Sequence, residues 1–293
     1  MTHGGSSMVA SLRRVLLAEP DTAGWGDPER IAAAPALGYP RPADPARARA
    51  EHAALAAALV AAEVEILALP PAREFSLDAV FTHDASFMTD AGAILLSMGK
   101  PERAAEPARH GAFYERIGVP ILGRIDPPGT VEGGDLVWLD AATILAGRGY
   151  RTNAVGIEQL RALVAPAGVE VVAAPLPHGQ GPECCLHLMS LLSLLDETTA
   201  LVDVAWLSVP TLELLRDRGY ALIPIEPAER DQLAGNVLSL GRRRLLAMEG
   251  SPETRRRMEA AGFEVRLFPG RELGMNGGGG PTCLTRPILR GES

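Results

Sequence analysis

Hydrophobic residues along this chain fall into two kinds of segment. Short runs rich in leucine, isoleucine and valine predict strands, whereas longer stretches of alanine, arginine and glutamate predict helices. In the clearest stretch, residues 236–240 and 244–248 predict two strands joined by a tight turn, 252–261 a helix and 263–267 a third strand. This order of strand, turn, strand, helix and strand defines a module of about fifty residues.

The same module recurs along most of the chain. Further copies begin near residues 85, 134 and 187, and a fifth requires a strand at 282–288 to pair with residues 14–17. One module cannot bury its own apolar face, so five copies predict a closed α/β ring that forms a single domain over residues 1–293. A doubly wound parallel sheet is the alternative, but parallel neighbours need long crossovers that tight turns do not provide.

One polar side chain recurs at the start of the first strand in every module. Equivalent positions in a pseudo-symmetric ring face one axis, so we expect these groups to converge. A cysteine nucleophile, a histidine acid/base and a carboxylate that orients the histidine together meet the requirements of covalent catalysis. The recurring residues are Asp84, Glu132, His187, Asn236 and Cys283.

Cys283 follows four consecutive glycines, which have no side chains to bury it. Glycine lets the backbone approach a ligand closely and present N–H groups to developing negative charge, so a thiol there suggests a nucleophile. Structural alternatives are a flexible tail around Cys283, a hydrogen-bonded core histidine at His187 and a simple tight turn at 132–135. The shared position of these residues in the module favours the catalytic interpretation.

Composition narrows the class of protein further. A net charge of −8 argues against a general binder of nucleic acids or anionic membranes. Three cysteines, two of them adjacent at Cys184 and Cys185, provide neither a disulfide framework nor a metal-binding pair, so a cytoplasmic protein is expected. The chain shows no secretory or membrane-spanning pattern. Apolar helix faces are compatible with a homodimer.

Five short motifs in order resemble the guanidino-group modifying superfamily, which includes arginine deiminase, dimethylarginine dimethylaminohydrolase and the amidinotransferases. The resemblance covers nearly the whole chain and implies a five-bladed α/β-propeller (pentein) built from β-β-α-β modules. The motifs are Phe81-Thr82-His83-Asp84, Glu132-Gly133-Gly134-Asp135, Arg151-Thr152-Asn153, Leu186-His187-Leu188 and Gly277-Gly278-Gly279-Gly280-Pro281-Thr282-Cys283.

The resemblance implies a role for each catalytic residue. Cys283 is expected to attack the guanidinium carbon and form a covalent thiouronium. His187 then protonates the departing amine and activates water, while Glu132 orients His187. Neither a metal nor an organic cofactor is implied.

The resemblance also implies a substrate site. Asp84 pairs with the guanidinium and Asp78 adds a second acidic contact, while Arg103 and Arg151 hold an α-carboxylate, a role that suits the guanidinium fork. Surface salt bridges are the alternative for both arginines. Residues 21–40 match the substrate lid in location.

Two departures bear on the substrate. Met189 replaces an aspartate found in the deiminases and amidinotransferases, which favours an alkylated or less polar head, and His83 occupies a position that usually holds arginine or glutamate. The expected reaction is hydrolysis of dimethylarginine to citrulline and dimethylamine. Arginine, citrulline or another guanidino or ureido compound is the alternative substrate. A non-catalytic binder of arginine analogues and a redox or metal thiol at Cys283 are the rival interpretations.

Overall fold

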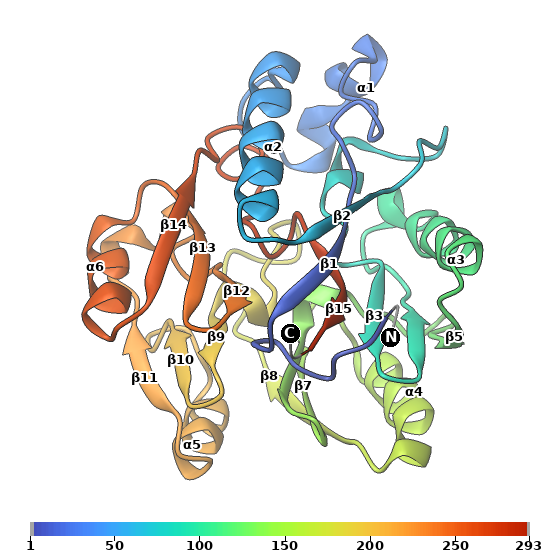
Figure 1. The fold of residues 1–293 in the computed structure, drawn as a ribbon. Coiled ribbons are helices and arrows are strands. Elements are labelled where there is room, and N and C mark those ends of the chain that lie inside the picture. Colours follow the sequence, from blue (N-terminus) through green and yellow to red (C-terminus); the bar gives the residue numbers. More distant parts are fainter. Residues whose placement is uncertain (1–2, 292–293) are drawn as a thin grey trace.

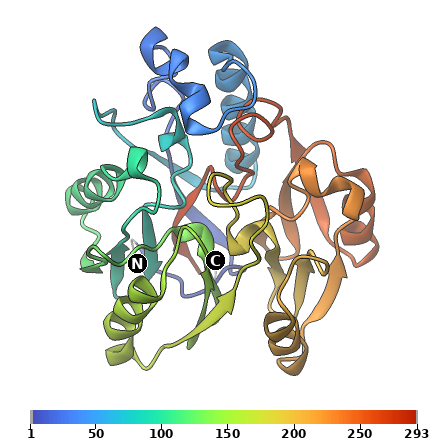
Figure 2. The same cartoon turned by 180° about the vertical axis from the view of Figure 1, so that it is seen from behind.

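The computed structural model describes residues 3–291, and within that range fifteen strands form five separate three-stranded sheets. The sheets surround a common centre and the long helices lie on the outer rim (Figure 1). Figure 2 shows the same ring from behind. The closed ring of five β-β-α-β modules is therefore confirmed, and the doubly wound sheet is wrong.

Each module pairs its first two strands antiparallel and its second and third strands parallel. The helix supplies the long crossover that a parallel pair needs. Four modules are continuous in sequence: β3 (Ser86–Thr89), β4 (Gly92–Leu95), α3 (Glu106–Arg116), β5 (Ile121–Arg124); β6 (Leu136–Asp140), β7 (Thr143–Arg148), α4 (Ala154–Val164), β8 (Glu170–Pro175); β9 (Leu192–Asp196), β10 (Thr199–Val202), α5 (Val209–Asp217), β11 (Ala221–Pro224); and β12 (Leu238–Gly241), β13 (Arg244–Met248), α6 (Pro252–Ala260), β14 (Glu264–Phe268).

The fifth module joins both ends of the chain. Here β1 (Leu12–Leu17) lies between β15 (Arg286–Arg290), to which it is antiparallel, and β2 (Glu65–Ala68), to which it is parallel. The helix α2 (Pro45–Val60) provides the crossover, and its first turn is capped by the Asp44 side chain, which accepts from the Arg47 N–H. Because β15 is a paired strand, the flexible-tail interpretation of the Cys283 segment is wrong.

Apolar side chains hold neighbouring modules together. The rings of Phe87 on β3 and Trp138 on β6 stack with centroids 5.4 Å apart, and the Trp138 indole N–H donates to the Met88 carbonyl. Shorter helical segments join the modules: α1 (Pro28–Ala32), η1 (Ala34–Leu37), η2 (Leu77–Val80), η3 (Pro101–Arg103), η4 (Gly133–Asp135), η5 (Ala165–Ala167), η6 (Leu188–Ser190) and η7 (Pro227–Gln232).

The recurring polar residues do not lie on the first strands themselves, as the sequence predicted, but on the loops just before them. Asp84 and Asn236 precede β3 and β12 by two residues, and Cys283 precedes β15 by three. His187 precedes a turn of 3-10 helix, so the strand predicted from residue 187 begins only at Leu192. A loop can bend toward the axis where a strand cannot, and this displacement brings the side chains together.

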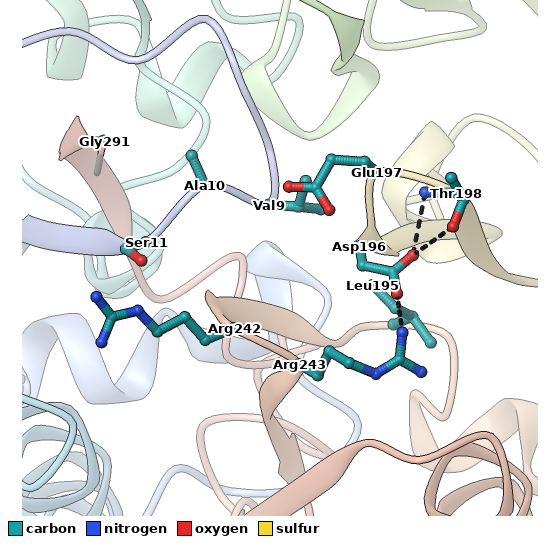
Figure 3. Close-up of a pocket in the computed structure, with 10 residues that line it drawn as sticks. All are labelled: Val9, Ala10, Ser11, Leu195, Asp196, Glu197, Thr198, Arg242, Arg243 and Gly291. Carbon is teal, nitrogen blue, oxygen red and sulfur yellow. Dashed lines mark hydrogen bonds and ion pairs between the residues drawn. The ribbon is translucent and has the colours of Figure 1, made fainter. Parts of the chain in front are cut away.

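A surface pocket of about 710 Å³ lies at the opposite end of the ring, beside the turns of the β9–β10 and β12–β13 hairpins. Asp196 and Glu197 line one side and Arg242 and Arg243 the other, with Asp196 and Arg243 forming an ion pair (Figure 3). None of the recurring polar residues contributes to it, because the loops that carry them lie at the other end of the first strands. Over the described range, no helix has the length and apolar character to cross a membrane.

Candidate active site

Asp84 is the centre of a buried network that joins three modules. One carboxylate oxygen accepts from the Gly134 N–H at 2.9 Å, and the other accepts from the Arg103 guanidinium at 2.7 Å. The first oxygen also lies 3.9 Å from Nδ1 of His187. Burial opposes ionisation of Asp84, but the charges of His187 and Arg103 outweigh it and hold the carboxyl pKa below its usual value.

Glu132 and His187 form the second part of the network. Nε2 of His187 lies 2.7 Å from Oε2 of Glu132, which is fully buried. The other carboxylate oxygen accepts from the backbone N–H groups of Gly99 and Lys100 at 3.0 and 3.1 Å. The carboxylate is therefore fixed on both oxygens, and it fixes the imidazole in turn.

The two glycines after Glu132 are required for close approach of the loops. A Cβ on Gly134 would lie 2.4 Å from Nδ1 of His187, and one on Gly133 would lie 2.1 Å from the His83 carbonyl oxygen. The next residue, Asp135, accepts from the Leu188 N–H at 2.9 Å and so positions the His187 loop. The motif at 132–135 is thus more than a tight turn.

Cys283 lies on the loop that leads into β15 and is half-buried. Its sulfur accepts a hydrogen bond from Nδ2 of Asn236 at 3.2 Å, and its carbonyl accepts from the His83 N–H at 3.1 Å. This second bond ties the cysteine loop to the loop that carries Asp84. The glycine run is needed here too, because a Cβ on Gly280 would lie 2.5 Å from Oδ1 of Asn236.

The thiol and the imidazole have opposite pKa shifts. Burial, reinforced by the Asp84 charge, raises the pKa of Cys283 to about 12. Burial alone would lower the pKa of His187, but the charges of Cys185 and Asp84 outweigh it and raise that pKa well above 6.5. Without substrate, burial thus disfavours the Cys283 thiolate, whereas the negative charges around His187 favour its protonated form.

The two predicted carboxylate-binding arginines differ. Arg103 is only 4% exposed and binds Asp84, both oxygens of Glu106 and the Phe81 carbonyl, so its interpretation as a surface salt bridge is wrong. Its predicted contact with substrate stays a prediction, and the structure gives it the task of holding Asp84. Arg151 lies 3.3 Å from Glu132, and its side chain is 11% exposed; its predicted contact with a substrate carboxylate stays a prediction.

Asp78 has a partner that the sequence did not predict. The Lys100 ammonium forms an ion pair with the Asp78 carboxylate and donates to the Leu37 carbonyl at 2.7 Å. Leu37 belongs to the predicted lid, which is anchored further by Trp25, whose buried indole donates to the Leu77 carbonyl at 3.1 Å. A movable lid stays a prediction, but these contacts identify what would hold it closed.

The two departures from the family pattern lie outside the network. Nδ1 of His83 lies 2.8 Å from the Thr285 carbonyl, its ring also contacts the Arg286 guanidinium, and burial together with the Arg286 charge lowers its pKa to about 3. Met189 is buried among Val137, Leu139 and other apolar side chains. Their predicted substrate contacts stay predictions, and their observed partners are those of core residues.

Two residues of the site were missed in the sequence. Cys185, dismissed as one of an adjacent pair, has its sulfur 3.6 Å from Nδ1 of His187. Lys100 belongs to none of the motifs, although it is the only lysine among the 28 lysine and arginine residues of the sequence. That count was the signal available for Lys100, whereas nothing in the sequence around Cys185 indicated its contact.

A cation is sterically compatible with part of this site, because ligand atoms of Asp84, Glu132 and His187 lie within 4.8 Å of one another. These atoms are already hydrogen-bonded to each other or to Arg103 and backbone N–H groups. The network is therefore satisfied without an ion, and we assign these residues no ligand role.

The fold and this network define the class of protein. Among solved structures, the chain superposes on an amidinotransferase of saxitoxin biosynthesis from Microseira wollei with a TM-score of 0.79, 16% identity and coverage of 100% and 98% of the two chains. It superposes on a citrulline complex of dimethylarginine dimethylaminohydrolase from Pseudomonas aeruginosa with a TM-score of 0.77, 25% identity and coverage of 95% and 100%. The chain is a member of the guanidino-group modifying superfamily, with the pentein fold.

Sequence comparison identifies the family within this class. Residues 37–290 match the model of the family described as N,N dimethylarginine dimethylhydrolase, eukaryotic. The chain is 32% identical to the N(G),N(G)-dimethylarginine dimethylaminohydrolase of Streptomyces coelicolor, over 69% of this chain and 71% of that one. It is also 26% identical to an arginine deiminase of Rhodococcus jostii, over 72% and 60% of the two chains. The chain belongs to the dimethylarginine dimethylaminohydrolase family, and it is a hydrolase that acts on carbon–nitrogen bonds of linear amidines.

Proposed function

We propose that the protein hydrolyses a carbon–nitrogen bond of a substituted guanidinium through a covalent intermediate on Cys283. Dimethylarginine is the first substrate to test, with citrulline and dimethylamine as the products. The observation that supports the proposal best is the buried Asp84–His187–Glu132 network, whose charges act on a half-buried thiol.

The first step needs a thiolate, which the free site disfavours. A guanidinium bound against Asp84 brings a positive charge next to Cys283, and a nearby cation favours the charged form of a thiol. The thiol loses its proton to solvent and the thiolate attacks the guanidinium carbon. The tetrahedral intermediate then collapses as the C–N bond breaks. The departing amine takes the proton from His187, which leaves a thiouronium on Cys283.

The second step reverses the role of His187. The imidazole, now neutral, accepts a proton from the attacking water while Glu132 holds the ring. The new tetrahedral intermediate loses the sulfur as its leaving group, and a urea group is released. Cys283 and His187 return to their starting states, so one water is consumed for each amine released.

Support for the substrate comes from two directions. The names of the relatives from Streptomyces coelicolor and Pseudomonas aeruginosa favour dimethylarginine, at 32% and 30% identity. Relatives named arginine deiminase keep arginine as a second candidate. In either case Arg151 is the group proposed to hold a carboxylate, and residues 21–40 are proposed to close over the ligand.

A product assay tests the proposal. The protein is incubated with asymmetric dimethylarginine, arginine and citrulline, and dimethylamine, ammonia and ureido product are measured separately. We expect dimethylamine and citrulline in equal amounts, with at least a 10³-fold loss on Cys283→Ala. Cys184→Ala is the matched control, because Cys184 is exposed. Turnover that survives Cys283→Ala contradicts the covalent route, and turnover of arginine alone contradicts only the substrate.

A further inference from the structure

The chain uses arginine at every basic position except one, and that one lysine lies in the candidate active site. Arginine and lysine differ in chemistry: the guanidinium is a planar fork, whereas the ammonium is a compact point charge on a flexible stem. A single ammonium among so many guanidinium groups indicates that position 100 requires a compact cation.

Lys100 fills a cation position at the lid end of the site. Its ammonium is held by the Asp78 carboxylate and, at 2.7 Å, by the Leu37 carbonyl. The Lys100 side chain is 15% exposed and that of Asp78 6%, so the pair is largely shielded from water. The Lys100 backbone N–H donates to Glu132, which fixes the residue to the catalytic network.

The resemblance implies a guanidinium contact for Asp78, but in the structure its carboxylate pairs with Lys100 beside a lid carbonyl. A carboxylate and a carbonyl oxygen are also the partners that an α-ammonium group of an amino-acid substrate would need. At this end of the site both are already bound to an ammonium that belongs to the protein. A substrate ammonium would have to displace Lys100 or lie beside it, and two like charges in a shielded site repel each other strongly.

The remaining groups at the lid end are donors. Tyr39 is buried, and its hydroxyl faces the Asp78 carboxylate in a geometry that falls short of a normal hydrogen bond. Burial and the Asp78 charge raise the pKa of Tyr39 well above 10, so the hydroxyl keeps its proton and can donate. Together with the cations of Lys100 and Arg151, it provides positive charge and a donor suited to a carboxylate without a neighbouring ammonium.

We infer that Lys100 makes this enzyme selective for ω-guanidino carboxylates that lack an α-ammonium group. This inference rests on the proposed function, since the reaction at the guanidinium carbon is unchanged. It alters only the other end of the substrate, where the protein supplies the ammonium that an amino acid would have brought.

A matched pair of substrates tests the inference. Asymmetric dimethylarginine and its deamino analogue, 5-(N′,N′-dimethylguanidino)pentanoate, differ only in the α-ammonium, and both release dimethylamine. We expect kcat/KM of the wild type to favour the deamino compound by about 10²-fold, the scale of an unfavourable buried charge contact. Lys100→Met, which keeps length and removes charge, should reduce or reverse that preference by lowering the deamino rate and raising the amino-acid rate. Lys100→Arg is the charge-preserving control.

The outcomes separate the inference from the proposed function. A wild type that favours dimethylarginine overturns the selectivity and leaves the reaction standing. Equal increases in kcat/KM for both substrates in Lys100→Met also overturn the inference, because Lys100 would then obstruct the site without selecting between the substrates. No turnover of either compound by folded wild type overturns the proposed function itself. The wild-type ratio decides the matter even when the Lys100 variants do not fold.

Discussion

The reacting half of the site and its lid half are built differently. Asp84, Glu132, His187 and Cys283 come from equivalent loops of different modules, and each contacts a residue of another module. Asp78, Lys100 and Tyr39 have no counterpart in the repeat, and their contacts connect a single carboxylate to a single lid segment. The residues of the reacting half thus follow from the repeat, whereas those of the lid half are particular to single positions in the chain.

This difference separates chemistry from selectivity. In the reacting half every carboxylate is held on both oxygens, so a change in one residue leaves another buried charge without its partner. In the lid half a flexible ammonium stem spans from Asp78 to the lid carbonyl and can be replaced with little effect on the catalytic network. We therefore expect mutations in the first half to affect rate or folding, and mutations in the second half to affect substrate choice.

Glu132→Gln should have the largest effect on rate. The amide oxygen can still accept from the Gly99 and Lys100 N–H groups, but its NH₂ would face a protonated Nε2 of His187, so the imidazole loses its orientation. We expect kcat/KM to fall by about 10³- to 10⁴-fold with little change in thermal stability. Steady-state kinetics and a melting curve measure both. Glu102→Gln, on an exposed neighbour, is the control, and near-normal activity of Glu132→Gln would show that His187 is positioned by other groups.

Arg103→Met should mainly affect folding. Removal of this guanidinium leaves the buried carboxylate of Glu106 without a counter-charge and that of Asp84 with His187 alone, which costs about 3–5 kcal/mol of the free energy of unfolding. Arg151→Met removes an arginine on the lid side of the site. Its partner Glu132, in the reacting half, keeps three other hydrogen-bond partners, so the change should cost about 1 kcal/mol, the scale of one hydrogen bond.

Denaturant unfolding of both variants measures this contrast. Equal losses of stability would contradict the division between the two halves. The loss of unfolding free energy caused by Arg103→Met should also become smaller at lower pH. Burial raises the pKa of Glu106 to about 7 even with Arg103 present. Protonation of Glu106 removes one of the two carboxylate charges that Arg103 neutralises.

The ring and the reacting half were predictable because both follow from repetition. One polar residue in each module, in the same phase, indicated convergence before any distance was known. The exact strand limits were not predictable. Leucine runs such as 186–192 look alike whether they form a strand or a turn of 3-10 helix followed by a strand. Here Leu188–Ser190 form a turn of 3-10 helix, and the preceding His187 reaches Glu132.

The partners of the charged side chains were less predictable. Arg103 follows Lys100, Pro101 and Glu102 in a run typical of a surface, yet it is buried, because Asp84 and Glu106 together need a planar cation. Lys100, three residues earlier, turns instead toward the lid. Sequence spacing cannot distinguish these directions, since both depend on loops contributed by distant parts of the chain.

Cys185→Ser should have the smallest effect, and it concerns pH rather than rate. The charge of Cys185 raises the pKa of both His187 and Cys283, so its loss should lower both. Attack needs the Cys283 thiolate and a protonated His187. The two limbs of the kcat/KM profile report these two pKa values. Both limbs should therefore move to lower pH together, with the maximum changed by less than about tenfold, well below the loss expected when an acid or base is removed.

A pH–rate profile of Cys185→Ser beside the wild type measures this shift. Both thiols are exposed, and Cys184→Ser, at the adjacent cysteine, provides the control. A lower maximum at an unchanged pH would mean that Cys185 only packs against the imidazole. A shift of both limbs would show that a residue outside the repeat tunes the reacting half through charge. The loop of Cys185 is part of neither half. Its thiol would then act on the reacting half through the contact with His187.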